Sequence, residues 1–315
     1  LVNDARDADL VVVNTCSFLT SAVQESVDTI LEMTGGGKEV ICAGCLVSRY
    51  HEEVLAEIPE VVLCAGPGTY GRVVQAYEAG QRYLEPDFSS VVRRSFFSGT
   101  ASACVKVSEG CSNRCRYCLI PSLRGGLVSR TPRDIVEECR ILAGKGAKEI
   151  ILVAQDLGCY GRDIGLTDGL VRLIDDISVI DAVEWIRIMY VHPASLTRGL
   201  VRQIETNPRV CPYIDLPVQH VSDTVLKAMG RRGGAKAVHR AFDMIRSAAR
   251  EIWIRTSLMV GHPGEDGQAY AELRDFVSRG TVDHLGGFGY SPETGTKSAA
   301  MKAFPSRAPA LRRMP

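Results

Sequence analysis

The chain has 315 residues, of which 45% are hydrophobic and 23% are charged. This composition is typical of a globular protein and excludes a disordered, collagen-like or small disulfide-stapled chain. Lys plus Arg and Asp plus Glu each number 37, so the net charge of zero gives no overall attraction to nucleic acid or to an anionic membrane. The longest apolar runs, such as residues 150–154, are far shorter than the roughly 20 residues of a membrane-spanning helix, and no secretory signal opens the chain. We therefore expect a cytoplasmic protein without a membrane segment.

In the first third of the chain, Val- and Ile-rich segments alternate with segments of helical period. The strands are expected at 9–15, 39–43 and 61–65, with helices at 21–33 and 48–57 between them. This alternation predicts a small α/β domain with a parallel sheet over residues 1–88. The chain starts with Leu1 and a strand begins almost at once, so we expect the start of this domain to be missing.

A polar stretch at 81–100 is interpreted as a linker, and the alternation then resumes. Six strands are expected near 103–108, 148–154, 183–190, 212–218, 252–260 and 282–289. Thr131, Pro132 and Asp134 form a pattern like a capping box, which predicts the start of the first helix. Six consecutive β/α units predict a partial (β/α)6 barrel over residues 100–295. In such folds the chemistry lies at the carboxyl ends of the strands.

Residues 296–315 are basic and show no apolar periodicity, so they are expected to form a disordered tail. Contact of this tail with ribosomal RNA is the alternative, and direct nucleic-acid binding is left open.

Three of the eleven cysteines, Cys111, Cys115 and Cys118, lie close together just past the first barrel strand. The odd number of cysteines in a cytoplasmic chain argues against a disulfide framework. A structural zinc site would need a fourth ligand, and no second cysteine pair lies nearby. A [4Fe–4S] cluster held by three thiolates keeps one iron free. That iron can chelate the amino and carboxylate groups of S-adenosylmethionine, and a radical can be generated there.

The loop Gly110-Cys-Ser-Asn-Arg-Cys-Arg-Tyr-Cys118 resembles the radical S-adenosylmethionine (radical SAM) signature. Up to about Gly295 the chain is similar to the radical SAM methylthiotransferases, and its N-terminal part matches through Asp9-Leu-Val-Val-Val-Asn-Thr-Cys16 and Ala43-Gly-Cys45. The resemblance implies that Cys16 and Cys45 are ligands of a second, auxiliary [4Fe–4S] cluster. The third ligand of the family lies upstream of this sequence, so the auxiliary ligand set is incomplete here. The β-barrel domain that ends members of the family is expected to be absent.

Three segments favour one branch of the family, the RimO-type branch, which modifies a ribosomal protein. They are Ile120-Pro-Ser-Leu-Arg-Gly125, Arg187-Ile-Met-Tyr-Val-His192 and Leu216-Pro-Val-Gln-His220. The branch that modifies tRNA usually has Pro-Tyr-x-Arg-Gly at the first place and Gln-Ser-Gly at the last. One departure is His262, where the family more often has an aromatic residue.

The resemblance implies methylthiolation of the β-carbon of an aspartate in the twelfth protein of the small ribosomal subunit. One S-adenosylmethionine would donate the methyl group and a second would generate the radical. Flavodoxin or ferredoxin is expected as the low-potential electron donor. A tRNA adenosine methylthiotransferase and a non-catalytic metal-binding scaffold are the alternatives.

Six further residues are expected in the cofactor or substrate pocket, because they lie in the cluster loop, within a barrel strand or after one. A turn, capping or core-packing role is the alternative for each. These residues are Tyr117, Gln155, Asp156, Arg187, Gln219 and His220. Ordinary turn chemistry is expected for His192 and His262, which precede prolines. Buried thiols are expected for Cys42, Cys64 and Cys104.

Overall fold

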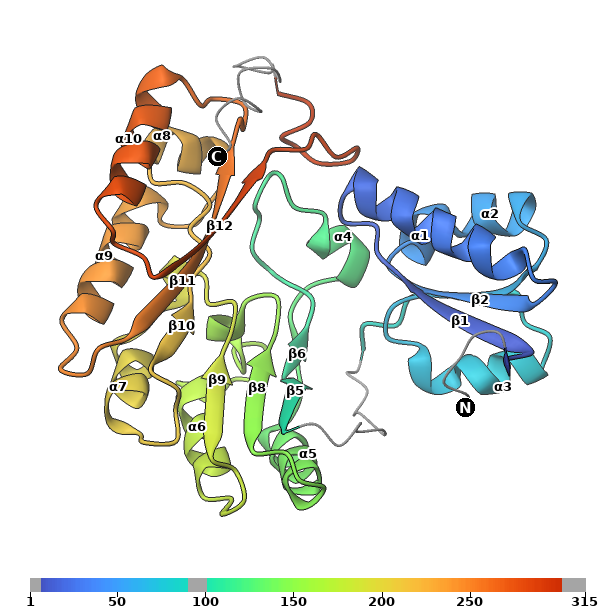
Figure 1. Ribbon diagram of the computed structural model, residues 1–315, viewed down its shortest axis with the longest axis horizontal. Coiled ribbons are helices and arrows are strands. Elements are labelled where there is room, and N and C mark those ends of the chain that lie inside the picture. Colours follow the sequence, from blue (N-terminus) through green and yellow to red (C-terminus); the bar gives the residue numbers. More distant parts are fainter. Residues whose placement is uncertain (1–6, 90–100, 302–315) are drawn as a thin grey trace. The chain divides into compact units, whose positions relative to one another are not determined.

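The computed structural model describes residues 7–89 and 101–301, and the chain divides into two compact units (Figure 1). The first unit comprises Leu1–Val92 together with the short segment Cys118–Gly126. The second comprises Arg93–Tyr117 and Leu127–Pro315. The fold class is α/β in both units, as the strand and helix periodicities predict.

The first unit is built on a parallel sheet in the order β1-β2-β3-β4. Its strands are β1 (Leu10–Thr15), β2 (Glu39–Gly44), β3 (Val61–Ala65) and β4 (Tyr83–Leu84). Its helices are α1 (Thr20–Thr34), α2 (Val47–Glu57), η2 (Tyr70–Arg72), α3 (Val73–Glu78) and α4 (Ile120–Arg124). The strand β4 lies inside the stretch predicted to be a linker, so that prediction is wrong for Tyr83 and Leu84. Residues 90–100 of the predicted linker lie outside the described residues.

The two faces of this sheet carry separate apolar cores. Val40, Cys42 and Cys64 belong to the core that includes Ile30 of α1 and Val54 of α2. Ile41 and Leu63 point to the other face, where Val73 and Ala76 of α3 complete a second core. Successive residues of β2 alternate between the two cores, as the pleat of a strand requires. The predicted burial of Cys42 and Cys64 is confirmed.

The second unit contains six parallel strands that follow one another in chain order (Figure 1). They are β5 (Ser102–Lys106), β8 (Glu149–Val153), β9 (Trp185–Ile188), β10 (Tyr213–Asp215), β11 (Trp253–Val260) and β12 (His284–Gly289). The groups β5-β8-β9 and β10-β11-β12 are joined where Ile186 N donates to Arg209 O and Cys211 N donates to Ile186 O. Among the described strands β5 and β12 each have one neighbour, which makes the sheet a partial barrel.

Helices follow these strands and bury one face of the sheet. They are α5 (Pro132–Gly144), α6 (Gly169–Ser178), α7 (Arg198–Thr206), α8 (Asp223–Ala228), α9 (Gly234–Arg246) and α10 (Gly267–Ser278). Short elements complete the unit: β6 (Ser108–Glu109), β7 (Val128–Ser129), η3 (Leu157–Cys159) and η4 (Pro193–Ser195). The alternating residues Ala103 and Val105 of β5 are buried beneath α5, whereas Cys104 between them is exposed. The predicted burial of Cys104 is therefore wrong, because this residue lies on the opposite side of the pleat.

Two further predictions are tested by the second unit. Thr131 caps α5 as predicted, with its side chain accepting from Asp134 N, and the Asp134 carboxylate accepts a hydrogen bond from Arg130 Nε at 2.6 Å. The prediction of a disordered tail from residue 296 is wrong for Thr296 and Ser298, which are buried. The remaining residues 302–315 of that tail lie outside the described residues. In the part of the chain that the structure describes, no helix is long and apolar enough to cross a membrane.

Helix α5 begins at a side-chain cap whose contribution can be measured. Thr131 Oγ1 accepts a hydrogen bond from Asp134 N at 3.3 Å. Thr131→Val keeps the volume but removes the acceptor, so we expect the free energy of unfolding to fall by about 1 kcal/mol in urea denaturation. Thr167→Val is the control, because Thr167 is exposed and no hydrogen bond of its hydroxyl is seen among the described residues. Equal stability of the two variants would contradict the cap.

Candidate active site

The three clustered cysteines lie on the connection between β6 and α4, beyond the carboxyl end of β5. All three are half-buried. The loop is anchored to the end of α8, where Arg116 N donates a hydrogen bond to Met229 O at 2.8 Å. Gly230 is required at this contact: its φ is +65°, and a Cβ atom there would lie 2.9 Å from Arg114 O. The backbone next to Cys115 is thus held against the helix that follows the fourth barrel strand.

A half-buried arginine, Arg231, faces this loop. Its guanidinium donates to Cys115 Sγ at 3.8 Å and to Pro217 O. Burial lowers the pKa of Arg231, but the charges of Tyr117 and Cys115 outweigh burial and hold the pKa above its ordinary value. A permanent positive charge therefore stands beside the cysteine, where it can stabilise a thiolate or an anionic cluster.

Asp156 is the centre of a buried hydrogen-bond network after β8. Its Oδ2 atom accepts hydrogen bonds from Asn113 Nδ2 at 2.7 Å, Ser195 Oγ at 2.9 Å and Cys159 Sγ at 3.1 Å. Its Oδ1 atom accepts from His192 N at 3.2 Å. Burial raises the pKa of Asp156, but the hydrogen bonds from Cys159 and Asn113 outweigh it and the pKa is lowered. The ionised carboxylate thus fixes Asn113, which lies in the loop between Cys111 and Cys115.

Gln155 is positioned by a second buried carboxylate. Its Nε2 atom donates to Glu109 Oε1 at 2.7 Å, and Lys106 Nζ lies 2.7 Å from the other carboxylate oxygen. Glu109 directly precedes Gly110 and the cluster loop, so Gln155 lies beside the start of that loop. Both Gln155 and Asp156 lie just past the carboxyl end of β8, which ends at Val153.

Gln219 and His220 lie beyond β10 and are both buried. Gln219 adopts a φ of +72° and bridges to β11, with its backbone N donating to Ser257 O at 2.8 Å. His220 Nδ1 accepts a hydrogen bond from Ser222 N at 3.0 Å, so its proton is on Nε2. That proton faces the buried carboxylate of Glu265, with Nε2 and Oε2 3.6 Å apart. Glu265 also accepts a hydrogen bond from Gly261 N at 2.8 Å, which holds the turn after β11.

Several buried polar atoms in this region have no hydrogen-bond partner among the described residues. They are Gln155 Oε1, His192 Nε2, Gln219 Oε1 and His220 Nε2. Buried polar groups are normally satisfied, so such a set is typical of a site for a polar ligand. Beside it, a pocket of about 300 Å³ is lined by residues that include Cys111, Asn113, Asp156, Cys159 and Arg232. S-adenosylmethionine, with its amino, carboxylate and hydroxyl groups, has the polar chemistry that these groups could bind.

Tyr117 packs against the barrel core, and its ring meets His262 edge-on at 6.3 Å. His262 donates from Nδ1 to Pro263 O and accepts at Nε2 from Ser298 Oγ, both at 2.8 Å. Burial lowers the pKa of His262 to about 4. Its role is therefore more than a turn before proline: the neutral ring joins Tyr117, the β11 turn and the segment around Ser298.

The buried neutral His262 predicts a loss of stability in acid. Its folded pKa of about 4 lies below the ordinary 6.5. The stability from the neutral ring is thus complete above pH 6.5 and is lost as the pH falls toward 4. For His262→Phe, we expect the melting temperature to fall less between pH 7.5 and pH 5 than in the wild type. His239→Gln, at an exposed site, is the control. An unchanged pH dependence in His262→Phe would contradict this assignment.

Arg187 is not brought together with Gln155 and Asp156. It pairs with Ile151 in the β8–β9 register, four residues before Gln155, which corresponds to about 13 Å along a strand. Its Nε donates to Glu149 Oε1 at 2.6 Å, and its guanidinium stacks on Tyr213 at 5.0 Å. Both partners are the first residues of their strands. Arg187 therefore lies nearer the amino ends of the strands.

Cys16 and Cys45 follow the carboxyl ends of two adjacent strands of the first unit. Thr15 of β1 and Gly44 of β2 are paired in register, and the two cysteines come directly after them. Gly44 has a φ of +110°, and a Cβ atom there would lie 2.6 Å from Thr15 O. Cys16 is exposed and Cys45 is buried. In the same unit, Arg124 Nε donates to Cys45 Sγ at 3.3 Å.

The cysteines carry the right chemistry for iron–sulfur clusters, but their sulfur atoms are not already grouped. Within residues 7–89 and 101–301, no three His, Cys, Asp or Glu side chains come close enough together to hold a metal ion. Cluster ligation is therefore inferred from residue type and from the position of the loop.

Sequence reasoning missed several residues of this region: Asn113, Cys159, Ser195, Arg231 and Arg232. The sequence offered a signal for some of them. Ser195 and Arg231 follow the third and fourth barrel strands, as residues of the pocket should. The segment 261–265, which includes Glu265, was a candidate because it follows the fifth barrel strand.

Comparison with known proteins identifies the family. The Radical SAM superfamily matches residues 105–277, and an uncharacterized protein family, UPF0004, matches residues 1–66. A ribosomal protein uS12 methylthiotransferase RimO from Geobacter sulfurreducens is 41% identical, and the match covers 96% of this chain and 70% of that protein. The RimO of Acetivibrio thermocellus is 39% identical, over 96% of this chain and 71% of that protein. This chain belongs to the RimO family of radical SAM methylthiotransferases.

A solved radical SAM enzyme has a similar fold. The radical SAM methyltransferase TsrM from Kitasatospora setae superposes with a TM-score of 0.67 at 15% identity, over 89% of this chain and 62% of that chain. The resemblance inferred from the sequence motifs is thus confirmed. The chain is an enzyme of the methylthiotransferase class, not a non-catalytic scaffold. Membership of the radical SAM superfamily implies a [4Fe–4S] cluster and S-adenosylmethionine.

Proposed function

We propose that this enzyme transfers a methylthio group to the β-carbon of an aspartate in the small-subunit ribosomal protein uS12. The observation that carries the proposal is the identity of about 40%, over nearly the whole chain, with relatives named as uS12 methylthiotransferases. A ribosomal substrate would place the reaction in the cytoplasm. An electron donor of low potential, such as flavodoxin or ferredoxin, would be a further partner.

In this proposal Cys111, Cys115 and Cys118 hold the radical-generating cluster. When bound, that cluster supplies the electron that cleaves S-adenosylmethionine and so makes hydrogen abstraction from an unactivated carbon possible. Arg231 keeps a positive charge beside Cys115. Asp156 orients Asn113 and with it the middle of the loop. The cysteines would thus ligate the cluster, and residues at the strand ends would hold the loop in place.

The unpartnered buried atoms Gln155 Oε1 and Gln219 Oε1, together with His220, whose Nε2 faces Glu265, are proposed to bind the polar groups of S-adenosylmethionine or of the substrate. Each is fixed by the fold: Gln155 by Glu109, Gln219 by its bridge to β11, and His220 by Ser222. Tyr117 offers an aromatic face beside the loop. Arg187 is held by Glu149 and is proposed to bind substrate from deeper in the barrel.

Cys16 and Cys45 are proposed as ligands of the auxiliary cluster, which would hold or deliver sulfur. Their positions after paired residues of β1 and β2 support this role, because adjacent strands end side by side. Arg124 would compensate negative charge at Cys45. The double variant Cys16→Ala/Cys45→Ala should lose methylthio transfer and part of its iron, yet still form 5′-deoxyadenosine.

The proposal is tested with the anaerobically reconstituted enzyme, S-adenosylmethionine, dithionite and purified small ribosomal subunits. Substrate protein carrying aspartate deuterated at the β-carbon should pass deuterium to 5′-deoxyadenosine. Fragment mass spectra should place the methylthio group on that aspartate. Formation of 5′-deoxyadenosine without deuterium, together with an unmodified protein, would overturn the proposed substrate but not the radical chemistry.

A further inference from the structure

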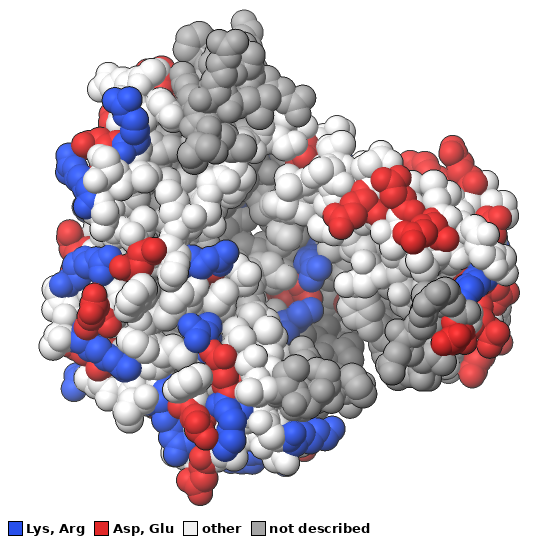
Figure 2. Space-filling view, in the orientation of Figure 1, with Lys and Arg blue, Asp and Glu red and all other residues white. Residues whose placement is uncertain are grey.

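The charges of this electrically neutral chain are divided unequally along its length. Residues 1–88 contain 14 acidic and 5 basic side chains, whereas residues 89–315 contain 23 acidic and 32 basic ones. In Figure 2 the visible face of the first unit is mainly acidic, and the visible face of the second carries both signs interspersed. A net charge of zero therefore does not describe either unit, and a local basic surface can exist on the second.

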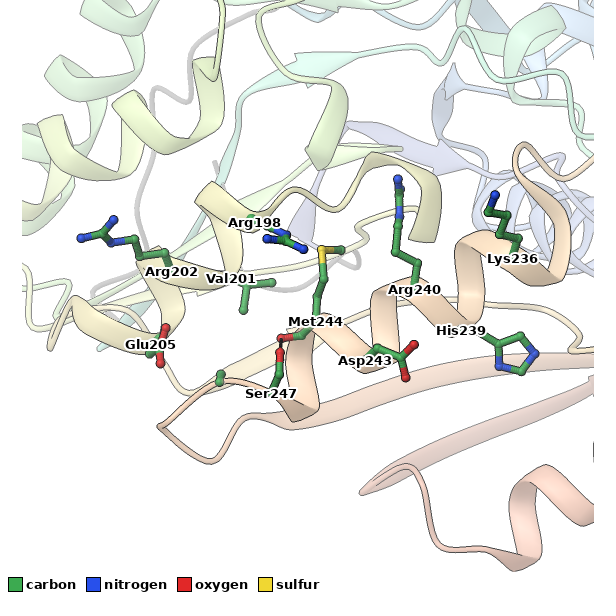
Figure 3. Close-up of a pocket in the computed structure, with 11 residues that line it drawn as sticks. Arg198, Val201, Arg202, Glu205, Lys236, His239, Arg240, Asp243, Met244 and Ser247 are labelled. Carbon is green, nitrogen blue, oxygen red and sulfur yellow. Dashed lines mark hydrogen bonds between the residues drawn. The ribbon is translucent and has the colours of Figure 1, made fainter.

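Such a surface is found between α7 and α9, in a groove of about 880 Å³. We call it the α7–α9 groove. Its cationic residues are Arg198 and Arg202 of α7 and Lys236 and Arg240 of α9. All four side chains are exposed. Figure 3 shows Lys236 and Arg240 projecting from the same side of α9, whereas Arg198 and Arg202 extend from α7.

The four cations are not neutralised by neighbouring carboxylates. None of them forms an ion pair with the residues that the structure describes, in contrast to Lys227, which pairs with Asp223 at 2.6 Å. Two acids line the same groove. Glu205 Oε1 accepts a hydrogen bond from Ala249 N at 2.6 Å, and Asp243 lines the groove without forming an ion pair with Arg240 among the described residues. The positive charge of the groove is therefore available to a ligand.

The positions of these cations are unfavourable for helix stability alone. Arg198 is the first residue of α7 and Lys236 is the third of α9, where the helix dipole is positive and acids are preferred. Neither helix has an acidic residue in its first turn. Cations at these positions add to the partial positive charge at the amino ends of the helices. The groove therefore favours an anion, especially phosphate. A binding function explains an arrangement that folding does not.

The two helices begin close in the chain to residues of the candidate active site. Helix α7 starts three residues after Ser195, which donates to Asp156, and α9 starts just after Arg232, which donates to Ser195. The groove is lined from Arg198 and Lys236 near these helix starts to Ala248 beyond the end of α9. Its amino-terminal end is therefore the part nearest the candidate site.

We propose that the α7–α9 groove binds the phosphate backbone of the ribosomal RNA that surrounds the substrate protein. This inference rests on the proposed function, because a substrate that is part of a ribosomal subunit is embedded in RNA. Arginine suits this role, since its guanidinium binds phosphate in a bidentate way. The groove would position the subunit so that the target side chain meets the active site. It would contribute affinity and orientation without base recognition.

The test compares two variants that carry the same change in charge. The groove variant is Arg198→Ala/Arg202→Ala/Lys236→Ala/Arg240→Ala. The control variant replaces four exposed cations of α5, of the turn that follows α5 and of α6: Arg133→Ala/Arg140→Ala/Lys145→Ala/Arg172→Ala. Binding of a fluorescein-labelled RNA hairpin to the holoenzyme is measured by anisotropy over a series of salt concentrations. Melting temperatures confirm that both variants are folded.

The groove variant should bind the hairpin at least tenfold more weakly near 150 mM salt, and its slope of log affinity against log salt should fall by about three. The control variant should stay close to the wild type. Equal weakening of both variants would overturn the inference, since it would indicate general electrostatic attraction. Loss of binding to labelled polyglutamate with RNA binding intact would also overturn it, because the groove would then bind an acidic protein.

An activity measurement links the groove to the substrate. The groove variant should modify intact small subunits at least tenfold more slowly, while its uncoupled formation of 5′-deoxyadenosine is unchanged. Unchanged modification of intact subunits would contradict a positioning role. Because RNA binding needs no radical chemistry, failure of the proposed function would show as an unmodified substrate in the wild type, independently of the binding result.

Discussion

Cys115→Ala is expected to abolish the formation of 5′-deoxyadenosine from S-adenosylmethionine. Cys115 is the middle cysteine of the loop, and Arg231 stands beside it. Two thiolates cannot replace the three that hold a site-differentiated [4Fe–4S] cluster. After anaerobic reconstitution, iron and sulfide content should fall by about four atoms each per chain. The measurement is chromatographic detection of 5′-deoxyadenosine with dithionite as the reductant.

Cys104→Ala is the matched control for this variant. Cys104 lies on β5 of the same unit and its thiol is exposed, but it is outside the loop. It should keep the iron content and the rate of the wild type. Full activity of Cys115→Ala, or an equal loss in Cys104→Ala, would refute the assignment of the cluster ligands.

Asp156→Asn is expected to lower the free energy of unfolding by about 3 kcal/mol. Three donors converge on Oδ2, and the neutral amide cannot accept from all of them without leaving buried groups unsatisfied. Asn113 loses its fixed position, so iron retention after reconstitution should fall several-fold as well. Urea denaturation and iron analysis measure the two effects.

The pH dependence of Asp156→Asn gives a further readout. The pKa of Asp156 is lowered in the folded state, because hydrogen bonds from Cys159 and Asn113 outweigh its burial. Its stabilisation is thus complete above the ordinary pKa of a carboxyl and is lost as the pH falls through the lower folded value. The difference between wild type and variant should shrink in strong acid. Asp175→Asn, at an exposed site, should change stability by less than about 0.5 kcal/mol at every pH. A difference that persists in acid would contradict the assigned charge.

The fold was predictable because segments rich in apolar and β-branched residues alternate with segments of helical period. Residues 149–153 and 253–260 are such segments, and both are strands. The strand expected at 212–218 is much shorter, Tyr213–Asp215, because prolines flank it and Pro217 has no N–H to pair. Strand β4, with two residues, is too short to give a periodic signal.

The site could be predicted only where its residues are neighbours in sequence. Cys111, Cys115 and Cys118 lie on one loop, so their spacing is visible. Asn113, Asp156 and Ser195 come from three different β/α units and meet only through tertiary packing. Asp156 was predicted from its position just after a strand, because the carboxyl ends of parallel strands lie at one edge of the sheet. It misplaced Arg187, since a position within a strand does not show how deep in the barrel the side chain lies.

Modification of a ribosomal protein by this enzyme is tested most directly in cells. Cells without the gene are compared with cells carrying a restored copy. Intact-mass spectra of the small-subunit ribosomal proteins and profiles of tRNA nucleosides are taken from the same cultures. We predict a gene-dependent methylthio increment on uS12 and unchanged tRNA. An unmodified uS12 with a gene-dependent methylthio-adenosine in tRNA would contradict the proposed substrate.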